Sequence, residues 1–220
     1  MPVKTKVEKK TTKQTTKQND ASVVISAPNF KTVEFSIKGD APYVQLKFSE
    51  KTKNQLLEKM ATEGNAKKGK KGSRNYQDEF IQSMYEGSKG ERGIPASAFR
   101  NAIISACRTV GFKMTLAKLS VFIEADFFDK NDGTPLIKIE GKPELVQHSV
   151  RNATGVVDFR TRAMWKEWTA KIKIRYDADQ FNENDVANLL MRVGLQVGIG
   201  EGRPDGKASA GMGWGLFSLK

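Results

Sequence analysis

A run of glycines near the C-terminus is the feature of this sequence that most limits the fold. Eight of the chain's 19 glycines lie in the 24 residues from Gly194 to Phe217. A helix-periodic segment precedes the run and an apolar segment, residues 214–219, follows it, which predicts an ordered loop between a helix and a strand. Glycine is favoured where the backbone takes positive φ or lies against a ligand. With Arg203 and Lys207 inside it, the loop is a candidate anion-binding site.

The net charge of the chain indicates polyanionic partners. The 220 residues contain 37 Lys and Arg against 25 Asp and Glu, which gives a net charge of +12 at pH 7. Such an excess favours nucleic acid or an anionic membrane surface. No apolar stretch has membrane-spanning length, and no signal-peptide core follows Met1. We therefore expect no membrane partner and a cytoplasmic location, in a bacterium or a phage-infected host cell.

The scarcity of cysteine and histidine limits the chemistry that the chain can perform. Cys107 and His148 are the only residues of their types, which excludes an internal disulfide, a cysteine-based zinc site and a histidine cluster. Cys107 falls on the apolar stripe of a predicted helix, so we expect a core residue and not a nucleophile. Asp126, Asp129 and Asp132 lack the downstream Glu of a calcium loop, so we interpret them as turn residues. We expect no metal and no cofactor.

Two basic segments lack the apolar periodicity of a packed element. Residues 1–20 contain six lysines and two acidic residues, which predicts a disordered basic arm. Residues 64–75 predict a basic loop insertion within a single domain that spans residues 21–220. Its candidate phosphate-binding residues are Lys67, Lys68, Lys70 and Lys71. A solubilising tail and an ordinary solvated loop are the alternatives for the two segments.

The rest of the chain alternates between strand and helix patterns. Alternating apolar residues predict strands at about 33–37, 43–48, 119–127, 136–139, 168–176 and 214–219. Helical spacing predicts helices at about 49–60, 76–85 and 93–111, and a further helix capped by Asn184. Residues 141–168 are less regular and predict a finger-like insertion. This order is compatible with an α+β fold: a ferredoxin-like or RRM-like βαββαβ antiparallel sheet with helices on one face, plus insertions.

Basic residues are interleaved with apolar and aromatic residues in two segments of the second half of the chain. In residues 168–176 the alternation predicts a strand with three cations on its free face, which is a plausible platform for a polyanion. In residues 141–168 arginines lie among aromatic residues, which suits single-stranded nucleic acid because bases stack on rings and guanidinium groups pair with phosphates. An edge hairpin with ordinary surface arginines is the alternative there. The candidate residues are Lys171, Lys173 and Arg175 in the first segment and Arg151, Arg160 and Arg162 in the second.

Two segments resemble a known family. Residues 94–102 read Ile-Pro-Ala-Ser-Ala-Phe-Arg-Asn-Ala and resemble the Ile-Pro-Gly-Ser-Ser-hydrophobic-Arg/Lys-Gly segment that opens the first helix of the RAMP superfamily. Ala96 and Asn101 stand here in place of the usual glycines. The run from Gly198 to Phe217 is similar to the glycine-rich loop before the last strand of that superfamily, whose members are CRISPR proteins built on ferredoxin-like domains.

The resemblance implies a backbone subunit of the kind that holds RNA. In such subunits the first helix meets the RNA backbone, which implies phosphate or sugar contacts for Ser97, Arg100 and Asn101. The insertion at residues 141–168 would then wedge between bases. The resemblance also implies a homo-oligomer of several copies along the strand, either in a CRISPR effector or as a stand-alone phage-encoded relative.

Three classes of function follow from these observations. The leading hypothesis is sequence-tolerant binding of single-stranded RNA or DNA through its phosphate backbone, without catalysis. The first alternative is a metal-independent endoribonuclease of the same superfamily, for which His148 and Asp40 are the candidate catalytic residues. The second alternative is a phage structural or inhibitor protein. Such an inhibitor would mimic a backbone subunit. Basic charge argues against an inhibitor that docks onto a nucleic-acid-binding groove, because such a groove favours an acidic mimic.

Overall fold

The computed structural model describes residues 26–48, 53–54, 57, 74–151, 157–206 and 211–220. The arm predicted over residues 1–20, most of the helix predicted at 49–60 and the greater part of the basic insertion lie outside these residues. So do five candidate phosphate-binding residues, namely Lys67, Lys68, Lys70, Lys71 and Lys207.

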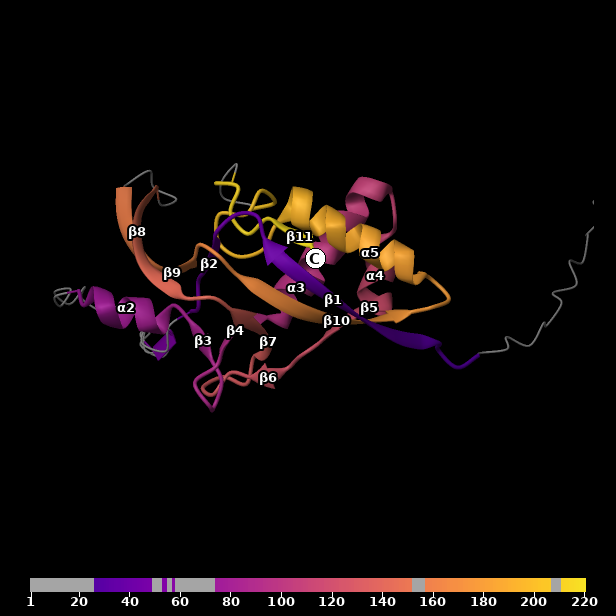
Figure 1. Ribbon diagram of the computed structural model, residues 1–220, viewed down its shortest axis with the longest axis horizontal. Coiled ribbons are helices and arrows are strands. Elements are labelled where there is room, and N and C mark those ends of the chain that lie inside the picture. The colour runs from indigo at the N-terminus through magenta and orange to yellow at the C-terminus, as the bar shows by residue number, and fades with distance from the viewer. Residues whose placement is uncertain (1–25, 49–52, 55–56, 58–73, 152–156, 207–210) are drawn as a thin grey trace, which may run out of the picture.

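An eight-stranded sheet forms the centre of the described fold (Figure 1). Strand β1 (Phe30–Gly39) pairs with β11 (Phe217–Leu219) on one side and with β10 (Thr169–Asp177) on the other. Strand β10 pairs in turn with β5 (Val121–Glu124) and β7 (Pro135–Glu140). The sheet continues through β4 (Arg92–Pro95) and β3 (Tyr85–Glu86), while β6 (Phe127–Phe128) pairs with β7. All of these pairings are antiparallel.

Helices cover one face of this sheet. Helix α3 (Ala96–Ala106) continues into a 3₁₀ turn, η1 (Cys107–Val110), and is followed by α4 (Met114–Ser120). Helix α5 (Glu183–Arg192) continues into a π-helical turn, η2 (Val193–Val197). The core contains Phe99 and Ile103 of α3, Leu190 of α5, and Ile172 and Ile174 of β10, all of them buried. Burying these side chains is the main source of stability, at roughly 25 cal/mol per Å² of apolar surface.

The face of the sheet opposite the helices carries every second side chain of its strands. On the helix-covered face, Val33 and Phe35 of β1 and Ile123 of β5 pack against the core. Since successive side chains of a strand point to opposite faces, their neighbours on β1, β5 and β10 point away from the helices. We call this the open face, and its side chains include Thr32, Glu34, Phe122, Glu124, Lys171, Lys173 and Arg175.

A second, three-stranded sheet consists of β2 (Tyr43–Gln45), β9 (Val157–Trp165) and β8 (Pro143–Arg151). Strands β8 and β9 form a long antiparallel hairpin with Pro143 opposite Trp165 and Arg151 opposite Val157. The hairpin curves away from the main sheet beside α2 (Tyr76–Gln82) (Figure 1). It occupies the residues predicted as a finger-like insertion, and it is far more regular than the sequence pattern indicated.

The structure corrects the predicted elements at several boundaries. Leu119 and Ser120, predicted as the start of a strand, are the last two residues of α4. Met114, Ala117 and Ser120 are turned toward the interior at helical spacing, while Leu119 is 70% exposed. The long helix starts at Ala96 and not near Gly93, since residues 93–95 pair with β7 as part of a strand.

The last helix and the last strand also differ from the sequence-based boundaries. Asn182, not Asn184, caps α5, because its side chain accepts from the N–H of Asp185 while the Asp185 carboxylate accepts from the N–H of Asn182. The final strand begins at Phe217 and not at Trp214. The structure is α+β with antiparallel sheets, as predicted, but its main sheet has eight strands, more than the four of a βαββαβ sheet.

Candidate nucleic-acid interface

Close packing and backbone conformation account for two central glycines of the C-terminal run, Gly200 and Gly202. Gly200 has φ of 80°, and a Cβ there would lie 2.6 Å from the carbonyl oxygen of Val44. Gly202 has φ of 74°, and a Cβ there would enter the ring of Trp214. Larger residues would strain the backbone and clash at both positions, so neither glycine requires a ligand to explain it.

The loop also uses many of its backbone N–H groups internally. Glu201 N–H donates to the Val44 carbonyl over 2.9 Å, and Ile199 N–H donates to the Gly215 carbonyl over 3.1 Å. The N–H groups of Met212 and Trp214 both donate to the Gly202 carbonyl. An anion cradle requires several N–H groups that converge on empty space, and these four are already occupied.

The arginines predicted to bind phosphate on this side of the molecule form bonds within the protein. Arg162 Nε donates to Glu201 Oε2 over 2.5 Å, and Arg160 Nη1 lies 3.7 Å from Glu201 Oε1. Arg203 Nη1 donates to the Gly200 carbonyl over 3.1 Å. The Arg162 and Glu201 side chains are only 13% and 17% exposed. Glu201 therefore joins the β8–β9 hairpin to the glycine-rich loop, and we call this contact the Glu201 clamp.

His148 belongs to the same contact. Its Nε2 lies 3.8 Å from Glu201 Oε1, and its ring packs edge-on against Trp214 at 5.3 Å between centroids. Burial lowers the pKa of His148, and the nearby Glu201 carboxylate only partly opposes that effect. The neutral, packed imidazole fits the structural role that a lone histidine most often has.

Of the three α3 residues predicted to contact a nucleic-acid backbone, two are exposed and one, Arg100, is bonded within the protein. Ser97 and Asn101 are exposed on α3. Arg100 donates through Nε to the Val121 carbonyl over 3.0 Å and through Nη2 to the Lys118 carbonyl. Its guanidinium also lies 5.0 Å from the centre of the Phe122 ring. Arg100 thus fixes the junction between α4 and β5.

The remaining predicted arginine, Arg151, is the last residue of β8, on the hairpin.

The open face brings together three of the predicted residues. Lys171, Lys173 and Arg175 are all exposed there, in a row along β10. Acidic residues lie beside them, since Lys173 is opposite Glu34 of β1 and opposite Glu124 of β5. A hollow of about 550 Å³ lies next to this row and is lined by both signs of charge, among them Lys138, Lys171, Lys173, Lys220, Glu34, Asp126 and Glu140.

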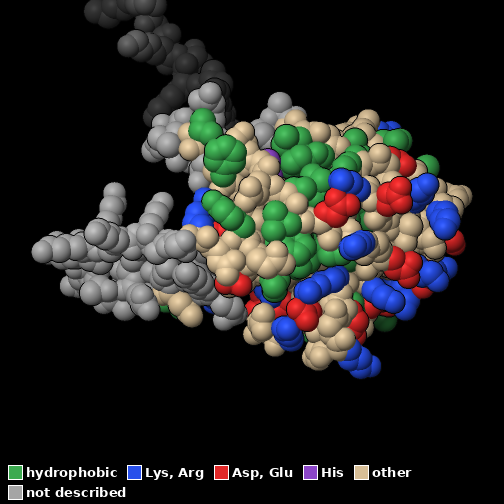
Figure 2. All heavy atoms as spheres, turned by 60° about the vertical axis from the view of Figure 1, so that its left-hand side comes forward, with side chains coloured by type: hydrophobic (Ala, Val, Ile, Leu, Met, Phe, Trp, Pro, Cys, Tyr) green, Lys and Arg blue, Asp and Glu red, His purple; other side chains and the backbone are tan. Residues whose placement is uncertain are grey.

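The excess positive charge is concentrated outside the described fold. Of the 37 Lys and Arg residues 13 lie outside the described residues, compared with 5 of the 25 Asp and Glu residues. Eight of the twelve net positive charges therefore belong to segments such as residues 1–25 and 58–73. On the face seen in Figure 2, Lys and Arg side chains are interspersed with Asp and Glu instead of forming one basic patch.

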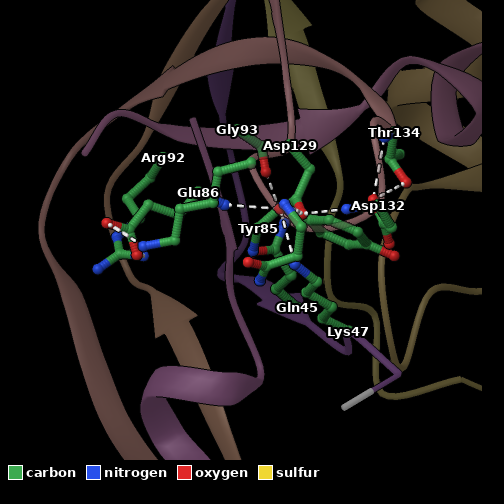
Figure 3. Close-up of polar contacts among 11 residues, drawn as sticks. Gln45, Lys47, Tyr85, Glu86, Arg92, Gly93, Asp129, Asp132 and Thr134 are labelled. Carbon is green, nitrogen blue, oxygen red and sulfur yellow. Dashed lines mark hydrogen bonds and ion pairs between the residues drawn. The ribbon is translucent and has the colours of Figure 1, made fainter. Parts of the chain in front are cut away.

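A buried ion pair joins the segment after β2 to the turn after β6, and the sequence pattern did not indicate it (Figure 3). Lys47 Nζ is 2.7 Å from both carboxylate oxygens of Asp129, and the two side chains are 5% and 0% exposed. Asp129 also accepts from the N–H groups of Glu86, Asn131 and Asp132. Burial alone would raise the pKa of Asp129, but these donors outweigh it and the pKa lies below its usual range. With its acceptor sites used, the pair is structural.

The two bonds from Asn131 and Asp132 are the turn chemistry expected of Asp129. The sequence did not reveal that Lys47 is the partner of Asp129. In the segment around Lys47 the apolar residues Leu46 and Phe48 alternate with polar ones, which predicts that the apolar residues are buried and that Lys47 is exposed. Leu46 and Phe48 are 50% and 56% exposed, whereas Gln45 and Lys47 are buried. The signal available in the sequence was a lysine between two apolar residues in a predicted strand.

Comparison with known proteins assigns this chain to no group: no family model and no curated protein matches it. Among the described residues, no cluster of three or more His, Cys, Asp or Glu side chains could hold a metal ion. No helix within the described ranges is long and apolar enough to cross a bilayer.

Proposed function

We propose that this protein binds single-stranded RNA or DNA without strong sequence preference and that the open face is the ordered part of its binding site. The observation that carries the proposal is the row of three exposed cations, Lys171, Lys173 and Arg175, on a sheet face opposite the helices. Cations in a row along a strand suit a polymer with regularly spaced phosphates.

The basic segments outside the described fold complete the proposal. The open face carries both signs of charge, so it attracts a polyanion weakly by itself. Residues 1–20 carry a net charge of +4, and the insertion adds Lys67, Lys68, Lys70 and Lys71. We infer that these segments supply sequence-independent attraction, while the open face sets the position of the strand.

The strand order supports a ferredoxin-like core as the finer description of the fold. Taken alone, β1, α3, β5, β10, α5 and β11 follow one another as βαββαβ, and their strands are arranged β11-β1-β10-β5. In this description β3, β4, β6 and β7 are additions to the core. The glycine-rich run lies between α5 and β11, and residues 94–102 open α3, which are the places that a RAMP-like domain would give them.

We further propose that binding occurs without catalysis and that several copies line one strand. Both candidate catalytic residues have contacts within the protein, since His148 packs on Trp214 and the Asp40 carboxylate accepts from Ser218 Oγ over 3.0 Å. The endoribonuclease alternative predicts shortened RNA after incubation with the protein, and His148→Gln would then abolish the cleavage.

Two matched triple variants test the proposed site. Lys171→Gln, Lys173→Gln and Arg175→Gln together should weaken binding of a labelled single-stranded oligonucleotide by roughly tenfold to a hundredfold, with affinity falling steeply between about 50 and 200 mM salt. Lys89→Gln, Lys113→Gln and Lys142→Gln remove three other exposed cations and serve as the control. Fluorescence anisotropy measures both. Equal losses would show that only total charge matters and would overturn the open face as the site.

A further inference from the structure

The geometry points to a nucleobase-stacking site at the corner of the open face formed by Phe30, Phe122 and Arg175. We propose that an unpaired base stacks there while the chain of phosphates follows β10. The inference rests on the proposed function and makes it more specific, because it requires a polymer whose bases are free. A duplex keeps its bases stacked on one another, so the site would select single strands.

The corner is built from the starts of β1 and β5 and the far part of β10. The rings of Phe30 and Phe122 are 5.7 Å apart between centroids and meet edge to face at 68°. The guanidinium of Arg175 lies 5.5 Å from the Phe30 centroid and 5.2 Å from the Phe122 centroid. Two aromatic rings and a planar cation therefore gather on a surface that solvent reaches, with Phe30 39% exposed.

Core packing does not account for these rings. The core side of β1 is formed by Val33, Phe35 and Ile37, and β5 contributes Val121 and Ile123 to the same side. Phe30 and Phe122 point to the other face, where aromatic residues bury less of their surface. Phe122 is covered in part by Arg100, Arg175 and Phe30, whereas Phe30 remains 39% exposed and offers its ring to a ligand.

The corner is also fixed in place before any ligand arrives. Arg100 stacks on Phe122 while its guanidinium is held by the carbonyls of Val121 and Lys118. The start of β1 is anchored because Ala178 N–H donates to the Asn29 carbonyl over 2.7 Å. Rings held in this way lose little conformational freedom when a base stacks on them, which favours binding.

The charges nearby fit a nucleotide better than a bare anion. Arg175, Lys173 and Lys171 extend from the rings along β10 at intervals of two residues, roughly 6.7 Å, so phosphates attached to a stacked base would meet cations in sequence. Glu34 and Glu124 flank Lys173 and reduce its attraction for phosphate alone. Binding at this face therefore needs a second source of affinity, and stacking supplies it.

The test compares two probes of equal charge: a labelled oligothymidine and an abasic oligonucleotide of the same length. Phe30→Leu and Phe122→Leu each keep an apolar side chain but remove the ring. Each should weaken binding of the oligothymidine by about tenfold and leave binding of the abasic probe unchanged. Phe128→Leu is the matched control, because Phe128 is 60% exposed and lies on β6, outside the corner.

The outcomes separate this inference from the proposed function. If the unmodified protein binds both probes equally well and the variants change neither affinity, the stacking site is wrong and phosphate binding remains. A corner that serves a protein partner would give that same result. If the protein binds neither probe, the proposed function fails and the stacking site fails with it. Should Phe122→Leu not fold, Phe30→Leu still decides the matter, since Phe30 is partly exposed and lies outside the core.

Discussion

The Glu201 clamp and the open face contain cations of the same kinds, but the two regions use them differently. In the clamp, Arg162 donates to a carboxylate, and Arg203 in the adjoining loop donates to a carbonyl. On the open face, Lys171, Lys173 and Arg175 are exposed in a row. A guanidinium has five donors and readily finds internal acceptors, so an arginine near a loop is weak evidence for a ligand. The number of cations in a segment therefore says less about binding than the acceptors around them.

The largest expected difference between the two regions is in stability. Glu201→Gln leaves the largely buried Arg162 side chain without its anionic partner, so it should lower the free energy of unfolding by about 2–3 kcal/mol. Glu34→Gln on the open face should change it by less than about 0.5 kcal/mol, because exposed charges contribute little. Urea denaturation followed by tryptophan fluorescence measures both. Similar losses of unfolding free energy in the two variants would contradict the conclusion that the clamp charges are structural and those of the open face are not.

Neutralising the six lysines of residues 1–20 by Lys→Gln changes separates the contribution of the arm from that of the open face and the insertion. We expect weaker binding to every single-stranded sequence, by roughly tenfold or more at low salt, and a shallower dependence of affinity on salt. The free energy of unfolding should remain the same and serves as the control. An unchanged salt dependence in anisotropy titrations would mean that the arm does not meet the polymer.

One pair of single substitutions compares the two regions directly. Arg175→Gln should weaken oligonucleotide binding by roughly three- to tenfold, because it removes an exposed cation from the proposed site. Arg160→Gln removes the same charge from beside the clamp and should change the affinity by less than about twofold. A larger effect from Arg160→Gln would move the interface to the hairpin, as the resemblance to backbone subunits implies.

The smallest effect concerns pH. Because burial depresses the pKa of His148, the folded protein binds this proton less readily than the unfolded chain does. The stabilising contribution is complete above the unfolded pKa of about 6.5 and is lost as the pH falls through the lower folded value. Urea midpoints should thus decrease between pH 7.5 and pH 5.5, and less so in His148→Gln. Equal decreases in the two proteins would assign the pH dependence to other groups.

Parts of the fold could be predicted from the sequence because local patterns determine them. The apolar stripe of the helix predicted at 93–111 placed Cys107 in the core, where it is buried. The alternation of β10 separated its exposed cations from Ile172 and Ile174. The boundaries of α4 could not be predicted this way. Its seven residues follow the helical spacing for only two turns before a strand begins, so the strand pattern dominated.

The candidate site was harder to predict because it depends on partners that are distant in the chain. Glu201 is 39 residues from Arg162, and Asp129 is 82 residues from Lys47. No local pattern in the sequence predicts such pairs. Each pair changes the role expected of its members, as when Arg162, predicted to bind phosphate, instead binds Glu201. The aromatic corner has the same character, since Phe30, Phe122 and Arg175 are brought together only by the strand order.

Strand β2 gives the hairpin a stiff mechanical connection to the rest of the protein. Its Gln45 side chain donates to the Gly93 carbonyl over 2.8 Å and accepts from the N–H of Tyr85 over 2.9 Å, while its backbone pairs with β9. These bonds are directional and shielded from water, so the strand cannot slide by one residue without breaking all of them. A load applied to β9 would therefore be transmitted through β2 and these two bonds to β3 and β4.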